Sequence, residues 1–97
     1  MKGYLIANIE VHDQQAFEEY RGKVAPLIAR FGGRYLVRGG KLHALEGDLG
    51  LKRLVILEFP SLADAERFYD SPEYRPVLEL RSASTTSQVV LAEGYAG

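Results

Sequence analysis

Two stretches of this sequence have the alternation of β-strands yet are largely apolar on both faces. Side chains alternate across a strand, so residues 3–11 divide into two sets. One face holds Leu5, Ala7, Ile9 and Val11, and the other holds Tyr4, Ile6, Asn8 and Glu10. Residues 52–59 divide in the same way, with Glu58 on the second face. A sheet with one face in water alternates more cleanly. The second face therefore needs a partner or a ligand, and its polar residues need a role.

Helical periodicity predicts where the other elements lie. Apolar residues recur at helical spacing over 14–31, after Asp13 as an N-cap and before a glycine pair at 32–33. A second helix is expected after Ser61, and a third over 73–81 beyond a break at Ser71 and Pro72. Further strands are expected over 34–38, 41–46 and 88–95, with Gly39 and Gly40 as the hairpin turn between the first two.

The resulting order is β-α-β-β-α-β, with its second strand extended into a hairpin. This order is the ferredoxin-like motif, an α+β fold with an antiparallel four-stranded sheet. Right-handed crossovers place both helical segments on one face of that sheet. A chain of 97 residues supports one such domain, spanning 1–97. We therefore expect the other face to be covered by a second copy, as a homodimer.

Composition excludes several classes of function. A net charge of −1 offers no general attraction for nucleic acid or for an anionic membrane. An RNA-binding sheet needs exposed aromatic residues, whereas Leu54, Ile56 and Glu58 occupy the expected position. The chain has no cysteine, and its histidines, His12 and His43, are far apart. We expect no metal, no cofactor and no membrane span, and a cytoplasmic location.

The candidate site is a group of polar residues on the face away from the helices. Alternation places Glu58 and Arg38 there together, and His43 comes from the predicted hairpin. A carboxylate in an apolar cavity has a raised pKa and can transfer protons, and an arginine beside it can orient an anion. Glu58, Arg38 and His43 are thus the catalytic candidates. The ligand-binding candidates are Tyr4, Asn8 and Glu93. The alternative is that Arg38 and Glu58 only neutralise each other.

Several segments also resemble a known family. Residues 35–40 (YLVRGG), 55–61 (VILEFPS), 68–74 (FYDSPEY) and 93–95 (EGY) are similar to the small bacterial family called domain of unknown function 1330. The resemblance covers essentially the whole chain. It implies a dimeric α/β barrel, in which two sheets face each other. Its wider superfamily includes cofactor-independent monooxygenases and lactone isomerases, so it implies no single reaction.

The combined expectation is a small enzyme or ligand-binding protein. Its ligand would be a small, partly apolar, anionic molecule in a cavity between sheet and helices or between paired sheets. If it is an enzyme, its chemistry would be monooxygenase-like or isomerase-like without a cofactor. The alternative is a non-catalytic structural dimer whose polar sheet residues are paired for stability.

Overall fold

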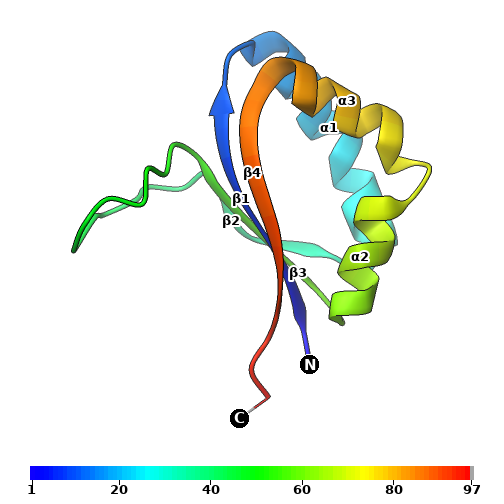
Figure 1. Cartoon of the computed structure of the whole chain (residues 1–97). Helices are drawn as coiled ribbons and strands as arrows, with labels where there is room; N and C mark the ends of the chain where they lie inside the picture. The colour runs from blue at the N-terminus through cyan, green and yellow to red at the C-terminus, as the bar shows by residue number, and fades with distance from the viewer. Residues whose placement is uncertain (97) are drawn as a thin grey trace.

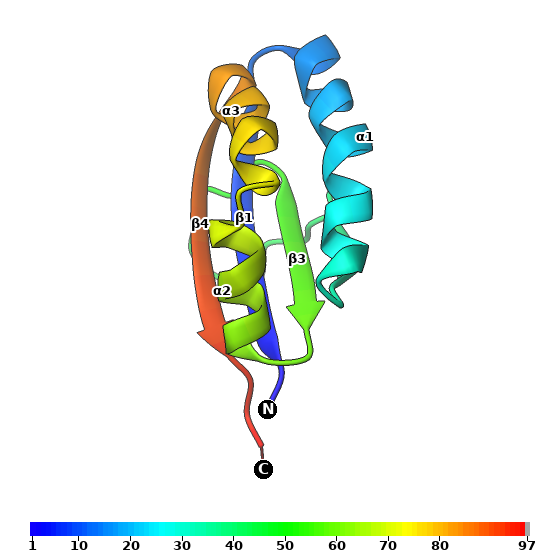
Figure 2. The same cartoon turned by 90° about the vertical axis from the view of Figure 1, so that its right-hand side faces the viewer.

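A computed structural model describes residues 1–96 and shows a four-stranded sheet with three helices on one face (Figures 1 and 2). The elements are β1 (Gly3–Val11), α1 (Gln14–Arg30), β2 (Arg34–Arg38), β3 (Leu54–Phe59), α2 (Leu62–Asp70), α3 (Tyr74–Ser84) and β4 (Thr85–Glu93). The sheet order is β2-β3-β1-β4, and every pair is antiparallel. The predicted ferredoxin-like fold is confirmed.

The central strand β1 separates its side chains as the alternation predicts. Leu5, Ala7 and Ile9 are buried beneath the helices, and Tyr4 and Ile6 are half-buried on the other side. We call that other side the open face. Register confirms the assignment, because Tyr4 lies opposite Glu58 and Ile6 lies opposite Ile56. The open face also presents Val90, which is 57% exposed.

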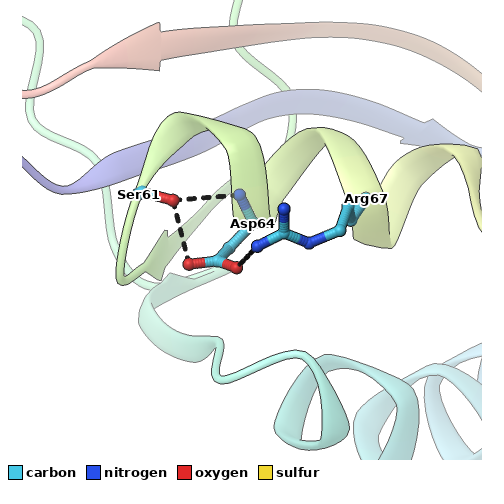
Figure 3. A network of polar contacts seen from close by, with 3 residues as sticks. All are labelled: Ser61, Asp64 and Arg67. Carbon is cyan, nitrogen blue, oxygen red and sulfur yellow. Dashed lines mark hydrogen bonds and ion pairs between the residues drawn. The ribbon is translucent and has the colours of Figure 1, made fainter.

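Capping side chains set the starts of the first two helices. The Asp13 carboxylate accepts a hydrogen bond of 3.1 Å from the Ala16 amide at the start of α1. At the start of α2, the Ser61 hydroxyl accepts from the Asp64 amide at 3.1 Å and donates to the Asp64 carboxylate at 2.9 Å (Figure 3). Arg67 then pairs with Asp64 from one turn further along. Both helix starts were readable from the sequence, because caps are local.

The end of the chain differs from the prediction in its boundaries. Helix α3 continues to Ser84, and β4 begins at once with Thr85, whereas the predicted helix ended at 81 and the predicted strand began at 88. The Ser84 and Thr85 hydroxyls donate to backbone carbonyls of α3, at Leu80 and Arg81, with distances of 2.6 and 2.7 Å. These bonds satisfy the last turn of the helix internally, so no separate loop is needed.

The predicted strand over 41–46 does not form. The backbone takes φ +69° at Gly39, and residues 40–50 are exposed and irregular. We call residues 40–52 the arm, which extends away from the body of the domain in Figure 1. The Asn8 side chain fixes the C-terminal end of the arm to β1. It donates a hydrogen bond to the Gly50 carbonyl at 3.2 Å and accepts one from the Lys52 amide at 2.8 Å. A strand needs a neighbour for its hydrogen bonds, and the arm has none within residues 1–96.

A β-bulge in β2 changes which side chains face the helices. Tyr35 lies opposite Leu57, but Val37 lies opposite Ile56, so Leu36 is the additional residue. The alternation is shifted by one position beyond it. Val37 therefore joins the open face, and Arg38, opposite Val55, lies on the helix side. The prediction that Arg38 shares a face with Glu58 is wrong for this reason.

Candidate functional site

A cavity lies between the sheet and the helices, beneath α1 and α3. Its floor is apolar and includes Leu5, Ala7 and Leu57 of the two central strands. It offers about 40 Å³ to the centres of water molecules, about three times the minimum for one water. Small-molecule sites are typically apolar hollows with a few convergent polar groups, and this cavity has that composition.

Two buried tyrosine hydroxyls meet in the lining of the cavity. Tyr20 of α1 and Tyr74 of α3 are 2.9 Å apart at their oxygens, and either can be the donor. Burial raises the pKa of both phenols, and Arg81 is the nearby cation that opposes the rise. Both hydroxyls therefore remain protonated at neutral pH. Because the pair shares one hydrogen bond, one hydroxyl proton remains for another acceptor.

Arg81 of α3 also lines the cavity and is only 6% exposed. Its Nη2 donates to the Tyr69 hydroxyl at 3.3 Å, and its buried Nε has no partner. Together with Tyr20 and Tyr74 it forms what we call the inner group. Buried arginines are normally paired with an anion, and none of the ion pairs within residues 1–96 involves Arg81.

Three further arginines, Arg21, Arg38 and Arg53, line the cavity near the edge strand β2. We call them the edge arginines. The Arg38 guanidinium lies 4.5 Å from the centre of the Tyr35 ring, and that of Arg53 lies 5.4 Å from the centre of the Phe17 ring. Burial lowers the pKa of Arg53, and the charges of Arg21 and Arg38 lower it further. Arg21 and Arg38 are therefore close enough to Arg53 to repel it.

The cavity contains an excess of positive charge. Among its lining residues in 1–96 are four arginines and no carboxylate. One of the four, Arg21, pairs with Glu18 at 3.0 Å, on the more exposed side of α1. The Nε atoms of Arg21, Arg53 and Arg81 are buried without a partner. An anion bound among these groups would supply the missing acceptors.

Glu58 lies outside this cavity, on the open face. Its two carboxylate oxygens accept from Arg34 Nε at 2.9 Å and from the Tyr4 hydroxyl at 3.1 Å. The predicted Glu58–Arg38 pair is therefore wrong, and Arg34 is the partner. The hydrogen bond from Arg34 is the main reason that the pKa of Glu58 is lowered. The expected rise in that pKa is also wrong, so Glu58 is ionised and paired at neutral pH.

This pairing predicts the pH dependence of a variant. A carboxylate whose pKa is depressed by folding contributes stability above its ordinary pKa of roughly 4.3. That contribution disappears as the pH falls through the depressed value. We expect Glu58→Gln to lower the free energy of unfolding at pH 7, and the difference from wild type to vanish at strongly acid pH. Urea titrations between pH 2 and pH 7 measure it, with the exposed Glu66→Gln as the control. If the variant is less stable than wild type by the same amount at every pH, the assigned role of the ionised Glu58 carboxylate is wrong.

The remaining predicted site residues are dispersed. Asn8 is on the open face, where it also contacts Gln88 at 3.2 Å and holds the arm. His43 is exposed in the arm. Glu93 lies opposite Gly3 at the end of β4, exposed and aligned with the helix side. The structure does not bring these residues together with Glu58 or Arg38.

Sequence reasoning missed most of the cavity's polar residues. Arg21, Arg53 and Tyr35 gave no signal as a group, because they come from α1, from the residue before β3 and from β2. Only Arg81 had a signal in the sequence, since it occupies an inward position in the apolar repeat of its helix. An arginine on a buried helix face is unusual enough to suggest a site.

Residues 1–96 provide neither a metal-binding group of side chains nor a membrane-spanning helix. Residues 1–96 contain no group of three or more His, Asp or Glu side chains arranged to hold a metal ion. None of the helices there has both the length and the apolar character required to cross a bilayer.

Comparison with known proteins identifies relatives at the level of family and fold. The model of the family described as domain of unknown function (DUF1330) matches residues 2–95. A crystal structure of a protein of unknown function from Rhodopseudomonas palustris is similar, with a TM-score of 0.78 and 18% identity over 99% of this chain and 84% of that one. No curated protein matches.

Two further solved structures are similar to this chain. A dimeric ferredoxin-like protein of unknown function from Jannaschia sp. CCS1 has a TM-score of 0.69 and 17% identity, covering 97% of this chain and 100% of that one. SnoaB, a cofactor-independent oxygenase from Streptomyces nogalater, has a TM-score of 0.63 and 17% identity, covering 99% of this chain and 95% of that one. At these identities the likeness establishes the shared fold.

Proposed function

This chain belongs to the DUF1330 family, as its sequence segments predicted, and from that premise we propose that it is a cytoplasmic protein that binds a small, partly apolar anion. The proposed site is the cavity between the sheet and the helices. The observation that carries the proposal is the group of four arginines lining that cavity without a lining carboxylate.

The buried guanidinium of Arg81 needs a counter-charge. Removing a guanidinium from water is costly unless an anion and hydrogen-bond acceptors replace the water. Arg81 has one long hydrogen bond to Tyr69 and an unpartnered Nε. Its position at a concave, otherwise apolar site makes a bound anion the natural counter-charge. Uncompensated charge at such a place is a recognised mark of a functional site.

The same groups suit catalysis as well as binding. When a weakly acidic C–H or phenol loses its proton, negative charge develops on an oxygen. Cations and hydroxyls fixed in a desolvated cavity stabilise that charge. SnoaB, a relative in fold, is a cofactor-independent oxygenase. Chemistry of that kind is our proposal for the enzymatic form of this function, with the inner group holding the oxyanion.

Small anions and neutral analogues test the binding proposal. We expect propionate to raise the melting temperature of wild type and 1-propanol to leave it unchanged, since a ligand that binds only the folded state stabilises it by mass action. Arg81→Met should abolish the response, and Arg75→Met, an exposed arginine on the same helix, should retain it. If no carboxylate or phenol in a broad panel stabilises wild type, the proposal is wrong.

We further propose that the chain forms a homodimer through its open face. Ile6, Leu54 and Ile56 lie there with Val37 and Val90, a continuous apolar surface across four strands. Monomers rarely leave such a surface in water. The relative from Jannaschia sp. CCS1 is described as dimeric.

Sedimentation equilibrium tests the dimer. Wild type is expected at about twice the monomer mass of 10.8 kDa at low micromolar concentration. Ile56→Asp should shift it to monomer, because a carboxylate would be buried in the interface. Ala63→Asp, which adds the same group on the exposed side of α2, should leave it dimeric. A monomeric wild type would refute the proposal.

A non-catalytic dimer is the second candidate. The observation that favours it is the Tyr4–Glu58–Arg34 group, in which both carboxylate oxygens are satisfied within the chain. Such pairing fits a structural role on the open face. It does not explain the unpaired arginines of the cavity, so the two candidates differ in the ligand response described above.

A further inference from the structure

The arm, residues 40–52, is unusually apolar for an exposed segment. It contains Leu42, Leu45, Leu49 and Leu51, whereas connecting segments in water are normally polar. Leu45 is 87% exposed and Leu49 is 84% exposed, so most of each side chain is in contact with water. Single exposed apolar residues are common, but several in one short segment indicate a contact with another surface.

The arm projects from the open face of the sheet. Asn8, on that face, donates to the Gly50 carbonyl and accepts from the Lys52 amide, so the C-terminal end of the arm lies over the open face. In Figure 1 the helices lie to the right of the sheet and the arm extends to the left. In Figure 2, where the helices face the viewer, the arm lies behind the sheet. The arm therefore lies on the side from which a second copy approaches in the proposed dimer.

A shallow apolar hollow connects the arm to the sheet. Leu51 of the arm lines it together with Ile6, Leu54 and Val90 of the open face. These three sheet residues belong to the apolar surface proposed as the dimer interface. That surface therefore continues onto the arm, and one occupant can cover both.

The length of the arm is sufficient to reach a facing copy. Two sheets packed face to face lie about 10 Å apart. Each half of the arm has about six residues, which span roughly 20 Å when extended. The arm can therefore pass alongside a sheet that covers the open face. A two-fold dimer makes the contact reciprocal, because each copy presents the same surface to the other.

We propose that each arm packs its leucines against the second copy in the homodimer. This inference rests on the proposed dimer and adds a second contact to the one made by the open face. It accounts for the exposure of Leu45 and Leu49 in a single chain, because their partner surface belongs to the other copy.

Sedimentation equilibrium of the full chain tests the contribution of the leucines. Replacing both exposed leucines, as Leu45→Ser with Leu49→Ser, should raise the dissociation constant of the dimer at least about 100-fold. The loss is large because each apolar contact occurs twice in a symmetric dimer. Glu46→Ser changes a polar residue of the same segment and should leave the constant unchanged. Circular dichroism checks that both variants are folded.

Fluorescence tests the location of the arm directly. The chain has no tryptophan, so one introduced indole reports its own surroundings. Leu45→Trp should emit at shorter wavelength in the dimer than in the Ile56→Asp background, where the protein is expected to be monomeric. Ala63→Trp, on the exposed side of α2, is the control and should emit at the same wavelength in both backgrounds.

The outcomes distinguish this inference from the dimer on which it rests. If wild type is dimeric and the double serine variant keeps its dissociation constant, the arm contact is overturned and the open-face dimer stands. The same conclusion follows if Leu45→Trp emits as in water in both backgrounds. If wild type is monomeric, the proposed dimer fails and the arm contact fails with it.

Discussion

Phe68→Ala is expected to lower the free energy of unfolding by about 3–5 kcal/mol, the usual cost of removing a buried aromatic ring. Phe68 is 1% exposed and lies at the centre of an aromatic cluster. Its ring centre is 4.6 Å from that of Tyr74 and 5.4 Å from that of Phe59. The loss is a large part of the 5–15 kcal/mol that small domains possess. Urea denaturation at 10–25 °C measures it.

Phe31→Ala is the matched control for this loss. Phe31 is also in the cluster, with its ring centre 6.0 Å from that of Phe68, but it is half-buried. The same truncation should therefore cost clearly less there, because fewer contacts are lost and water can enter the space. Equal losses at the two positions would show that burial does not determine the cost in this cluster.

Arg81→Met is expected to raise the free energy of unfolding of the ligand-free protein by about 1–4 kcal/mol. Methionine keeps much of the volume of the arginine side chain and removes its desolvated charge. Replacing buried charged groups by apolar residues has had effects of this size elsewhere. The same substitution should remove the response to anions. A gain in stability joined to a loss of binding is typical of residues kept for function.

Arg75→Met provides the comparison, because Arg75 is exposed in the first turn of the same helix. Surface substitutions of this kind usually change stability by less than about 0.5 kcal/mol. If Arg81→Met instead destabilises the protein by several kcal/mol, Arg81 is a structural residue. Its hydrogen bond to Tyr69 would then be its main contribution.

The fold was predictable because its signals are local. Alternation over β1 and β3 assigned Leu5 and Leu57 to the core and Tyr4 and Glu58 to the open face, and register confirms each assignment. Caps such as Asp13 act within one helical turn. The element order then determined the topology, since crossover handedness leaves few arrangements.

Two local departures from regularity were not predictable. The bulge at Leu36 moved Arg38 to the helix side, and alternation has no means of showing an additional residue. The predicted strand over 41–46 has a plausible pattern, but a strand also requires a neighbour. The bulge separated Arg38 from Glu58, and the missing strand left His43 exposed in the arm, so the site prediction failed where the fold prediction succeeded.

The cavity itself depends on contacts between distant segments. Tyr20 and Tyr74 are 54 positions apart, and the edge arginines come from three different segments. Such a group is visible in sequence only as single residues, each with an ordinary explanation. Arg81 was the exception, because a charge on an apolar helix face conflicts with its surroundings.

The arm has a consequence for how this family can diversify. The arm leaves the sheet at Gly39, and Asn8 bonds its other end at Gly50 and Lys52. Both ends are therefore fixed, while residues 41–50 remain exposed. Closing a loop costs only about 0.6 kcal/mol more for each doubling of its length. Relatives can therefore lengthen, shorten or rewrite this segment without disturbing the sheet beneath it. The properties of this exposed surface can change independently of the cavity, because the cavity is built from other parts of the chain.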